Sequence, residues 1–272
     1  MASTEAKPDV PSVEPTAAAA EGGPVITLHW LEKSRSHRIL WLLEELHVTY
    51  VLKTYKRGSD FLAPPELKKV HPLGKSPVIS VKPAPDQPEF VIAESALIIE
   101  YLSQYFGGWL VPQQYRPGFE GKIGGETPEW LRYRFLMHYG EGSLMTLLLM
   151  ALTAEGIRKA PVPFFIKPIT KRVASGIEDQ FLTRNFATHF SFLEEQLKTA
   201  PGGGPFFCGT ELTGADVLMI FPLEAALQRG IIDGAKMPQL KAWVERIIER
   251  PAYKRAVDKI VEATGEYNPV IS

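Results

Sequence analysis

The sequence predicts an α/β domain followed by an all-helical domain. Strand-like and helix-like patterns alternate in the order β-α-β-(α)-β-β-α over roughly 80 residues near the N-terminus. A Gly/Pro-rich stretch without helical periodicity follows at 107–126, and the sequence beyond it has the spacing of amphipathic helices. These observations predict a disordered tail, an α/β domain, a linker, a helical domain and a short C-terminal tail at residues 1–24, 25–106, 107–126, 127–266 and 267–272.

The composition of the 272-residue chain is that of an ordinary globular protein, with 45% hydrophobic and 22% charged residues. The net charge of −1 gives no argument for nucleic acid or an anionic membrane as partner. With Cys208 as the one cysteine, a disulfide framework within the chain is excluded, and a reducing compartment, the cytoplasm, fits best. The six histidines show no zinc-like spacing, so we expect no metal.

The first 24 residues are rich in Ala, Pro and Glu and contain no aromatic residue, so we expect them to be disordered. No run approaches the roughly 18 apolar residues that a membrane span needs. The last six residues, "YNPVIS", carry no retrieval or lipidation signal.

The α/β domain contains short apolar or alternating runs that predict strands at 26–30, 49–56, 78–81 and 90–93. From His37 onward, apolar residues recur at helical spacing, and a second helix begins at Glu94-Ser95. In the second half, Thr127 is a candidate N-cap with Pro128 at the first helical position. Helical patterns cover 127–152, 176–198, 212–230 and 237–263.

Two helix starts in the α/β domain have residues suited to anions. The loop 31–36 brings Ser34 and Ser36 to the first helix, where free N–H groups and the helix dipole favour negative charge. Either serine could simply cap that helix. Glu94 and Ser95 open the other helix, and a carboxylate beside free N–H groups suits the two charges of an α-amino-acid head group.

Four motifs in order, "SRSHRILWLLEEL", "HPLGKSPVI", "AESALIIEYL" and "TGADVLMIFPL", resemble the cytosolic-type glutathione transferases, and the likeness extends over residues 25 to about 266. "HWLEKSRSHRILWLLEEL" with "YGEGSLM" is most similar to a fungal and bacterial branch. The resemblance implies a thioredoxin-like domain with a four-stranded mixed sheet, a C-terminal helical bundle, a homodimer, and glutathione as co-substrate.

The same resemblance assigns roles to single residues. It implies a cis peptide before Pro77, backbone hydrogen bonds from Ser76 to the cysteinyl part of glutathione, and Lys75 near the glycyl carboxylate. Glu94 and Ser95 would hold the γ-glutamyl head. His71 departs from the asparagine that commonly starts this proline loop, which leaves the internal bonds of the loop open.

Ser34 matches the serine that activates the thiol in serine-type classes. A thiol of pKa near 8.5 is about 3% ionised at pH 7, and lowering that pKa by roughly 2 units gives about 75% thiolate. Ser36 is the alternative but lies nearer the helix start and is the better cap; backbone or water is a third possibility.

The resemblance also points to residues in the second half. Tyr139, His138 and Ser143 are candidates for lining the electrophile pocket. Thr213 and Asp216 match the buried capping box of the family, and Cys208, just before it, is expected to be buried and inert.

The function predicted is a glutathione transferase that attacks apolar electrophiles in detoxification or stress response, with hydroperoxide reduction as a side activity. The alternative is a glutathione-binding or regulatory protein without catalysis on the same scaffold. A thiol-disulfide reductase would need a cysteine in the 31–36 loop, and that loop contains none.

Overall fold

The computed structural model describes residues 12–13 and 23–268, and its chain forms two compact units. Unit 1 comprises the chain up to Phe106 together with the segment from Glu249 onward, and unit 2 comprises Gly107–Ile248. Each unit is described by itself below. Most apolar side chains of the strands and of the helix that follows the first long strand are buried in the core of unit 1.

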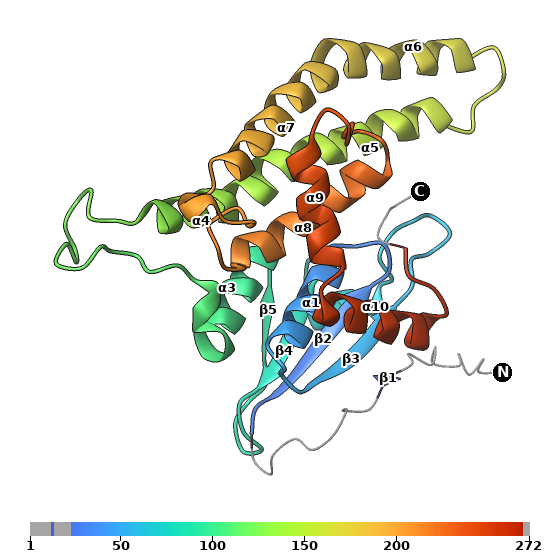
Figure 1. Ribbon diagram of the computed structural model, residues 1–272. Coiled ribbons are helices and arrows are strands. Elements are labelled where there is room, and N and C mark those ends of the chain that lie inside the picture. The colour runs from blue at the N-terminus through green and yellow to red at the C-terminus, as the bar shows by residue number, and fades with distance from the viewer. Residues whose placement is uncertain (1–11, 14–22, 269–272) are drawn as a thin grey trace, which may run out of the picture. The chain divides into compact units, whose positions relative to one another are not determined.

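Unit 1 is built on a mixed sheet with the strand order β1-β3-β2-β4-β5 (Figure 1). β2 and β3 are parallel, whereas β4 is antiparallel to both β2 and β5. The four strands β2 to β5 form the predicted thioredoxin-like sheet, and β1 adds a fifth strand at the edge of β3. The strands are β1 (Ser12–Val13), β2 (Val25–Leu31), β3 (Tyr50–Tyr55), β4 (Val78–Lys82) and β5 (Phe90–Ala93).

The short strand β1 corrects part of the predicted disordered tail. Ser12 pairs with Lys53 and Val13 with Leu52, both in the antiparallel sense, so two residues of the tail extend the sheet at the edge of β3. The edge strand β3 has unpaired backbone N–H and C=O groups, which β1 can pair with. Backbone pairing over two residues needs no periodic pattern of apolar residues, so the sequence does not predict it. The rest of the predicted tail, up to residue 22, lies outside the described residues.

The helices of unit 1 are α1 (His37–Glu45), α2 (Glu66–Val70), α3 (Ser95–Phe106) and α10 (Pro251–Thr264). The placement of α10 differs from the prediction, which put the chain through residue 266 in the helical domain. α10 packs along α1 within unit 1. The buried carboxylate of Glu44 on α1 explains this packing, because it accepts hydrogen bonds from Arg255 (3.0 Å) and from Tyr50 (2.5 Å), and forms an ion pair with Lys259.

Unit 2 is helical and begins with the linker, in which a single turn, η1 (Gly108–Leu110), is the only helix. The structure describes all of the linker residues 107–126. The other elements of the unit are α4 (Pro128–Tyr139), η2 (Gly140–Leu144), α5 (Met145–Lys159), α6 (Lys167–Ile177), η3 (Glu178–Leu182), α7 (Thr183–Lys198), η4 (Pro201–Gly203), α8 (Gly214–Gln228) and α9 (Pro238–Ile248).

The helix start at Thr127 and Pro128 is as predicted, since the Thr127 hydroxyl accepts the backbone N–H of Trp130 at 3.2 Å. α4 and α5 are joined through a π-helical turn, η2, into one helical stretch, Pro128–Lys159. By length and composition this stretch is long and apolar enough to cross a membrane, contrary to our expectation. A core helix of a soluble protein passes the same test, and 39% of its most apolar window is buried, so the finding is weak evidence for a span.

Prolines set two boundaries that helical periodicity alone did not place. Lys167 and Pro168 begin α6 nine residues before the predicted start at Gly176, because the first turn of a helix tolerates proline. Pro251 stands at the first position of α10 and separates it from α9, within a stretch predicted as continuous. The connection between α5 and α6 thus becomes a short loop at the end of a helical hairpin.

Candidate functional site

The loop between β2 and α1 holds both predicted serines, and Ser36 turns away from the helix that it was expected to cap. Ser36 occupies the N-cap position but makes no capping hydrogen bond with its side chain. Its Oγ instead accepts the N–H of Leu31 at 3.1 Å and donates to the Leu31 carbonyl at 3.0 Å. The residue is fully buried. Ser36 therefore closes the loop on the end of β2, and its predicted role as a cap is wrong.

Ser34 lies at the half-buried side of the same loop. Its Oγ donates to the Leu31 carbonyl at 2.7 Å, accepts the Ser36 N–H at 3.2 Å, and is 2.6 Å from the Ser36 Oγ. The two hydroxyls thus share one carbonyl acceptor. With the Ser36 hydroxyl bound to that carbonyl, the hydrogen of Ser34 has a choice of acceptors, and a change of acceptor requires only rotation about its C–O bond.

His37 is the first residue of α1, directly beside the two serines. Its ring is buried between Tyr253 and Tyr267, at centroid distances of 4.9 and 4.4 Å, and neither ring nitrogen has a hydrogen-bond partner among the described residues. Burial lowers the pKa of His37 to about 3, so the imidazole is neutral at physiological pH. Positive potential at this helix start therefore comes from the backbone dipole and from neighbouring cations, without help from His37.

The proline loop is fastened to the end of β2. The Ser76–Pro77 peptide is cis, as the resemblance implied, and the Ser76 hydroxyl donates to the His29 carbonyl at 2.7 Å. His29 on β2 is paired in register with Val78 on β4. The proline loop and the serine loop therefore meet at the same end of the sheet, although Ser36 and Ser76 are 40 positions apart in the sequence.

A buried polar cluster holds the β2 residue that anchors Ser76. The His29 ring lies 2.9 Å from the Tyr55 hydroxyl and 3.0 Å from the Ser80 hydroxyl, on the two neighbouring strands. Burial, with a smaller effect of Lys53, lowers the pKa of His29 to about 4. The ring is therefore neutral at physiological pH, and both of its nitrogens are used. No local pattern predicts this cluster, since a histidine in an apolar strand has no periodic signature.

Glu94 and Ser95 stand where β5 passes into α3. The pairing of Val78 with Ala93 brings this junction beside the proline loop. Glu94 has a positive φ of 73°, which is strained for a non-glycine residue and is typical of ligand-binding positions. Its carbonyl accepts the Ile98 N–H at 2.9 Å and so starts the helix, while its side chain is exposed. Ser95 is buried at the helix start.

These three segments surround a hollow of about 100 Å³ within unit 1. The five predicted glutathione contacts, Lys75, Ser76, Pro77, Glu94 and Ser95, all line it, with Arg35, His71, Leu73, Val78 and Ala93. Ser34 does not line the hollow, whereas its neighbour Arg35 does. The prediction missed Arg35, because a cation in a loop at a helix start has no local sequence signal that says whether it faces a hollow or water. His71, the departure from the family pattern, accepts the Gly74 N–H on its carbonyl at 2.8 Å.

The three candidates for the electrophile pocket have different surroundings in unit 2. The Tyr139 hydroxyl is 2.7 Å from Nδ1 of His189 on α7, and its ring stacks on Phe135. Burial raises the pKa of Tyr139 above its ordinary value, so this phenol stays protonated at physiological pH. His138 is exposed, and Ser143 lies half-buried in the π turn.

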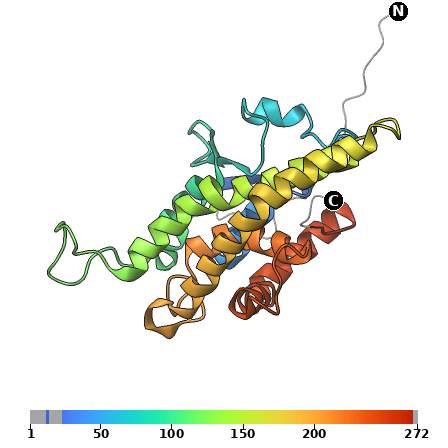
Figure 2. The same cartoon turned by 90° about the horizontal axis from the view of Figure 1, so that it is seen from above.

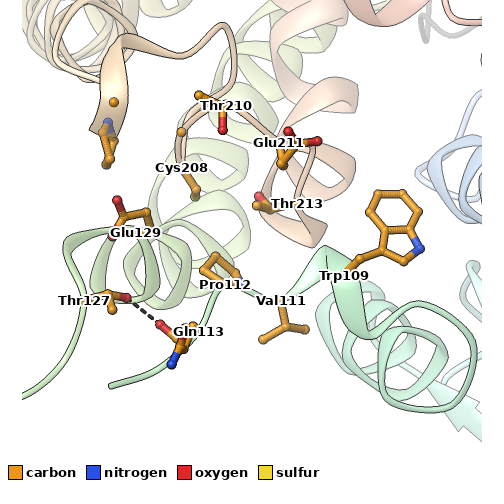
Figure 3. Close-up of a pocket in the computed structure, with 13 residues that line it drawn as sticks. Trp109, Val111, Pro112, Gln113, Thr127, Glu129, Cys208, Thr210, Glu211 and Thr213 are labelled. Carbon is orange, nitrogen blue, oxygen red and sulfur yellow. Dashed lines mark hydrogen bonds between the residues drawn. The ribbon is translucent and has the colours of Figure 1, made fainter. Parts of the chain in front are cut away.

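Unit 2 also has a larger hollow, of about 450 Å³, between the linker and the residues around the start of α8 (Figure 3). Of the predicted site residues it includes only Thr213, together with Trp109, Glu129 and Glu211. Cys208 also lines it, but burial, followed by the neighbouring Asp216, raises the pKa of this thiol, which is therefore unreactive. We assign no function to this hollow.

The start of α8 has the predicted capping box. The Asp216 carboxylate accepts the N–H and the hydroxyl of Thr213 at 2.9 and 2.8 Å. It also accepts the N–H of Phe207 and Nε1–H of Trp243, at 3.1 and 3.0 Å. The box is thus part of the core of unit 2. Among the described residues, no group of three or more His, Cys, Asp or Glu side chains is placed to hold a metal ion.

Comparison with known proteins places this fold and site in a family. Residues 23–104 match the description "Glutathione S-transferase, N-terminal domain", and residues 177–251 match "Glutathione S-transferase, C-terminal domain". Glutathione S-transferase 1 of Saccharomyces cerevisiae is 31% identical over 236 residues, which cover 87% of this chain and 95% of that protein. Glutathione S-transferase 3 of Schizosaccharomyces pombe is 31% identical and covers 88% of this chain and 90% of its own length.

Solved structures agree. A glutathione S-transferase from Actinobacillus pleuropneumoniae is 30% identical, with a TM-score of 0.63 over 86% of this chain and 92% of that one. A glutathione transferase homologue from Sulfitobacter with bound glutathione shares the fold at 17% identity, with a TM-score of 0.61 over 86% of this chain and 98% of that one.

The chain therefore has the architecture of a transferase with a thioredoxin-like domain followed by a helical domain. It belongs to the glutathione S-transferase family. The predicted fold class and the assignment to this family of enzymes are confirmed.

Proposed function

We propose that the chain is a serine-type glutathione transferase, in which the hollow of unit 1 binds glutathione and Ser34 stabilises its thiolate. Glutathione has two carboxylates and one ammonium group at neutral pH. The hollow offers two cations, Arg35 and Lys75, and one carboxylate, Glu94. This charge pattern complements the peptide, and the strained backbone of Glu94 supports a binding role for that residue.

In this proposal glutathione lies across the end of the sheet, from the start of α3 to the start of α1. Glu94 and Ser95 hold the γ-glutamyl head at the start of α3, where free N–H groups favour its carboxylate. The backbone of Ser76 before the cis Pro77 holds the cysteinyl part. Arg35 or Lys75 meets the glycyl carboxylate.

The observation that carries the choice of serine is the difference in burial and bonding between the two hydroxyls. Ser36 is fully buried and makes hydrogen bonds to both backbone groups of Leu31, so its oxygen has no room for sulfur. Ser34 is half-buried, and its hydrogen can leave the shared Leu31 carbonyl because Ser36 also donates there. A lowering of the thiol pKa by roughly 2 units corresponds to about 2.7 kcal/mol, which one charge-assisted hydrogen bond at a helix start can largely provide.

The thiolate would then attack an apolar electrophile brought to it, and a hydroperoxide would be reduced as a side reaction. Tyr139, His138 and Ser143 remain the candidates for contacting the electrophile. We further propose a homodimer in the cytoplasm. The exposed apolar side chains on α3 and β5 support self-association, and they are Phe90, Val91, Leu97, Tyr105 and Phe106.

A second candidate, a glutathione-binding protein without catalysis, is favoured by one observation. The hydroxyl of Ser34 is satisfied inside its own loop, so activation of the thiol requires that internal bond to break. If glutathione does not displace it, the protein binds the peptide without ionising it.

The test is a titration of the thiolate absorbance of bound glutathione in wild type, Ser34→Ala and the matched control Ser36→Ala. We expect a lowered thiol pKa in the wild type that rises by 1 to 2 units, roughly, in Ser34→Ala. We expect Ser36→Ala to lower the melting temperature, because two buried backbone groups of Leu31 lose their partner.

Each other outcome has its own meaning. A lowered thiol pKa that survives Ser34→Ala moves the role to the backbone or to water. Bound glutathione with an ordinary thiol pKa in the wild type favours the second candidate. No binding of glutathione at all refutes the assignment of the hollow.

A further inference from the structure

The loop that joins α5 to α6 exposes large apolar side chains, and we define it with the start of α6 as the hairpin tip, residues 160–173. Phe164 is 83% exposed and Phe165 is 65% exposed, at the turn itself. Ile169 and Val173, at 63% and 47%, continue the exposed surface along α6. Ile169 and Val173 are four residues apart on α6, so they form one stripe on the helix, and Phe165 precedes this stripe in the turn.

These side chains are not needed for packing within the hairpin. Its inner face has its own core, with Leu147 and Ala154 of α5 against Leu182, and with Ala151, Ile177 and Phe186 around them. The exposed stripe lies outside that core. An exposed apolar surface of this kind lowers solubility and is typical of a binding surface.

The charge around the tip is of one sign. From Gly156 to Ile177 the sequence contains five basic residues and no acidic residue. Arg158 and Lys159 are paired with Glu178 and Glu155, on the side of the tip nearest the body of unit 2. The remaining cations of the segment, Lys167, Lys171 and Arg172, are exposed on α6.

The position of the tip makes both features available to a flat surface. In both views the α5–α6 loop lies at the opposite end of unit 2 from the linker hairpin of residues 112–127 (Figure 2). Pro161 and Pro163 restrict the backbone just before the two phenylalanines, which limits the entropy lost when the tip is immobilised.

We propose that the hairpin tip docks the protein peripherally on an anionic phospholipid bilayer. Phe164 and Phe165 enter the boundary between headgroups and acyl chains, while Lys167, Lys171 and Arg172 lie against the anionic headgroups. This is the pairing of aromatic anchors and adjacent cations that interfacial helices use. The net charge of −1 does not show this local concentration of basic residues, because it is a sum over the whole chain.

The test is co-sedimentation of the full chain with phosphatidylcholine vesicles, with and without phosphatidylserine. We expect binding only with phosphatidylserine, and a weakening of binding as salt is raised. Phe164→Ser/Phe165→Ser removes the anchors and should lower the partition coefficient about tenfold or more. Lys167→Glu/Lys171→Glu should lower it by more than about fivefold per site, because each change reverses a charge.

The linker offers a matched control. Phe119 and Ile123 are also exposed, at 45% and 105%, with Arg116 and Lys122 beside Phe119. Phe119→Ser/Ile123→Ser should leave the partition coefficient unchanged. Melting temperatures of all variants check that each one folds.

Two results overturn the proposal. One is wild type that sediments with anionic vesicles no better than Phe164→Ser/Phe165→Ser does. The other is a change of oligomeric mass in that variant, measured by light scattering without vesicles, because the tip would then be an interface between copies of the chain.

Discussion

Removal of the Asp216 carboxylate is expected to destabilise unit 2 strongly. The side chain is fully buried and accepts three N–H groups, those of Phe207, Thr213 and the Trp243 indole, as well as the Thr213 hydroxyl. In Asp216→Ala the hydroxyl can rotate to another acceptor, but the three N–H groups are held by the backbone and by packing.

The magnitude follows from those three donors. Each buried donor without an acceptor costs about 1–3 kcal/mol, and the loss of one buried charge offsets part of the total. We therefore expect Asp216→Ala to lower the free energy of unfolding by roughly 3–5 kcal/mol at pH 7. Asp216→Asn keeps the shape and one acceptor oxygen, and it should be less destabilised than Asp216→Ala.

The pH dependence has a definite sign. Burial raises the pKa of Asp216 in the folded state, and the hydrogen bonds from Thr213, Phe207 and Trp243 offset only part of that increase. The folded protein therefore binds this proton more tightly than the unfolded chain, and the contribution of Asp216 to stability falls as the pH rises above the ordinary value of 3.8. The difference in the free energy of unfolding between wild type and Asp216→Ala should therefore become smaller as the pH rises above 3.8.

The assay is urea denaturation followed by tryptophan fluorescence, at several pH values and at fixed protein concentration. Asp233→Ala is the control, because Asp233 also accepts a backbone N–H, that of Ala235 at 3.1 Å, but is exposed. We expect no change in the midpoint for this control. A loss below about 1 kcal/mol in Asp216→Ala, with an unchanged m-value, would refute the reasoning, since the three donors would then have found other acceptors.

Three further predictions concern other parts of the molecule. Hydrogen bonds from Lys259, Tyr50 and Arg255 outweigh the effect of burial and lower the pKa of Glu44, so the contribution of Glu44 to stability is present above about pH 4.5 and is lost on acidification. Urea titrations at pH 7 should therefore show a lower free energy of unfolding for Glu44→Gln than for wild type. A difference between the two that stays undiminished at low pH would contradict this. Tyr139→Phe should lower the free energy of unfolding by about 1 kcal/mol, because the hydrogen bond to His189 is lost. An unchanged urea midpoint would mean that water replaces this hydrogen bond. Arg35→Ala should raise the KM for glutathione about tenfold with little change in kcat, and steady-state kinetics that show the reverse split would place Arg35 in the chemical step instead.

Several residues that line the hollow of unit 1 have local signals in the sequence. Pro77, Glu94 and Ser95 each stand at the end or start of a strand or helix, and such junctions have local signals: a missing donor, a first-turn acid, a small hydroxyl. The pairing of β4 with both β2 and β5 then brings these junctions together. Arg35 escaped notice because nothing in its own neighbourhood in the sequence distinguishes a loop cation that faces a hollow from one that faces water.

The local pattern of the sequence by itself determined the strands β2 to β5, the helix start at Thr127 and the capping box at Asp216, because each depends on residues within a few positions of one another. Only the tertiary structure decided that α10 belongs to unit 1, where the buried Glu44 needs the cations of a helix some 200 residues away. It likewise showed how the surroundings of the two serine hydroxyls differ. Their order in the sequence favoured Ser36 as the cap, but the end of β2 offers Ser36 two backbone groups in a buried place, and that contact leaves Ser34 as the accessible hydroxyl.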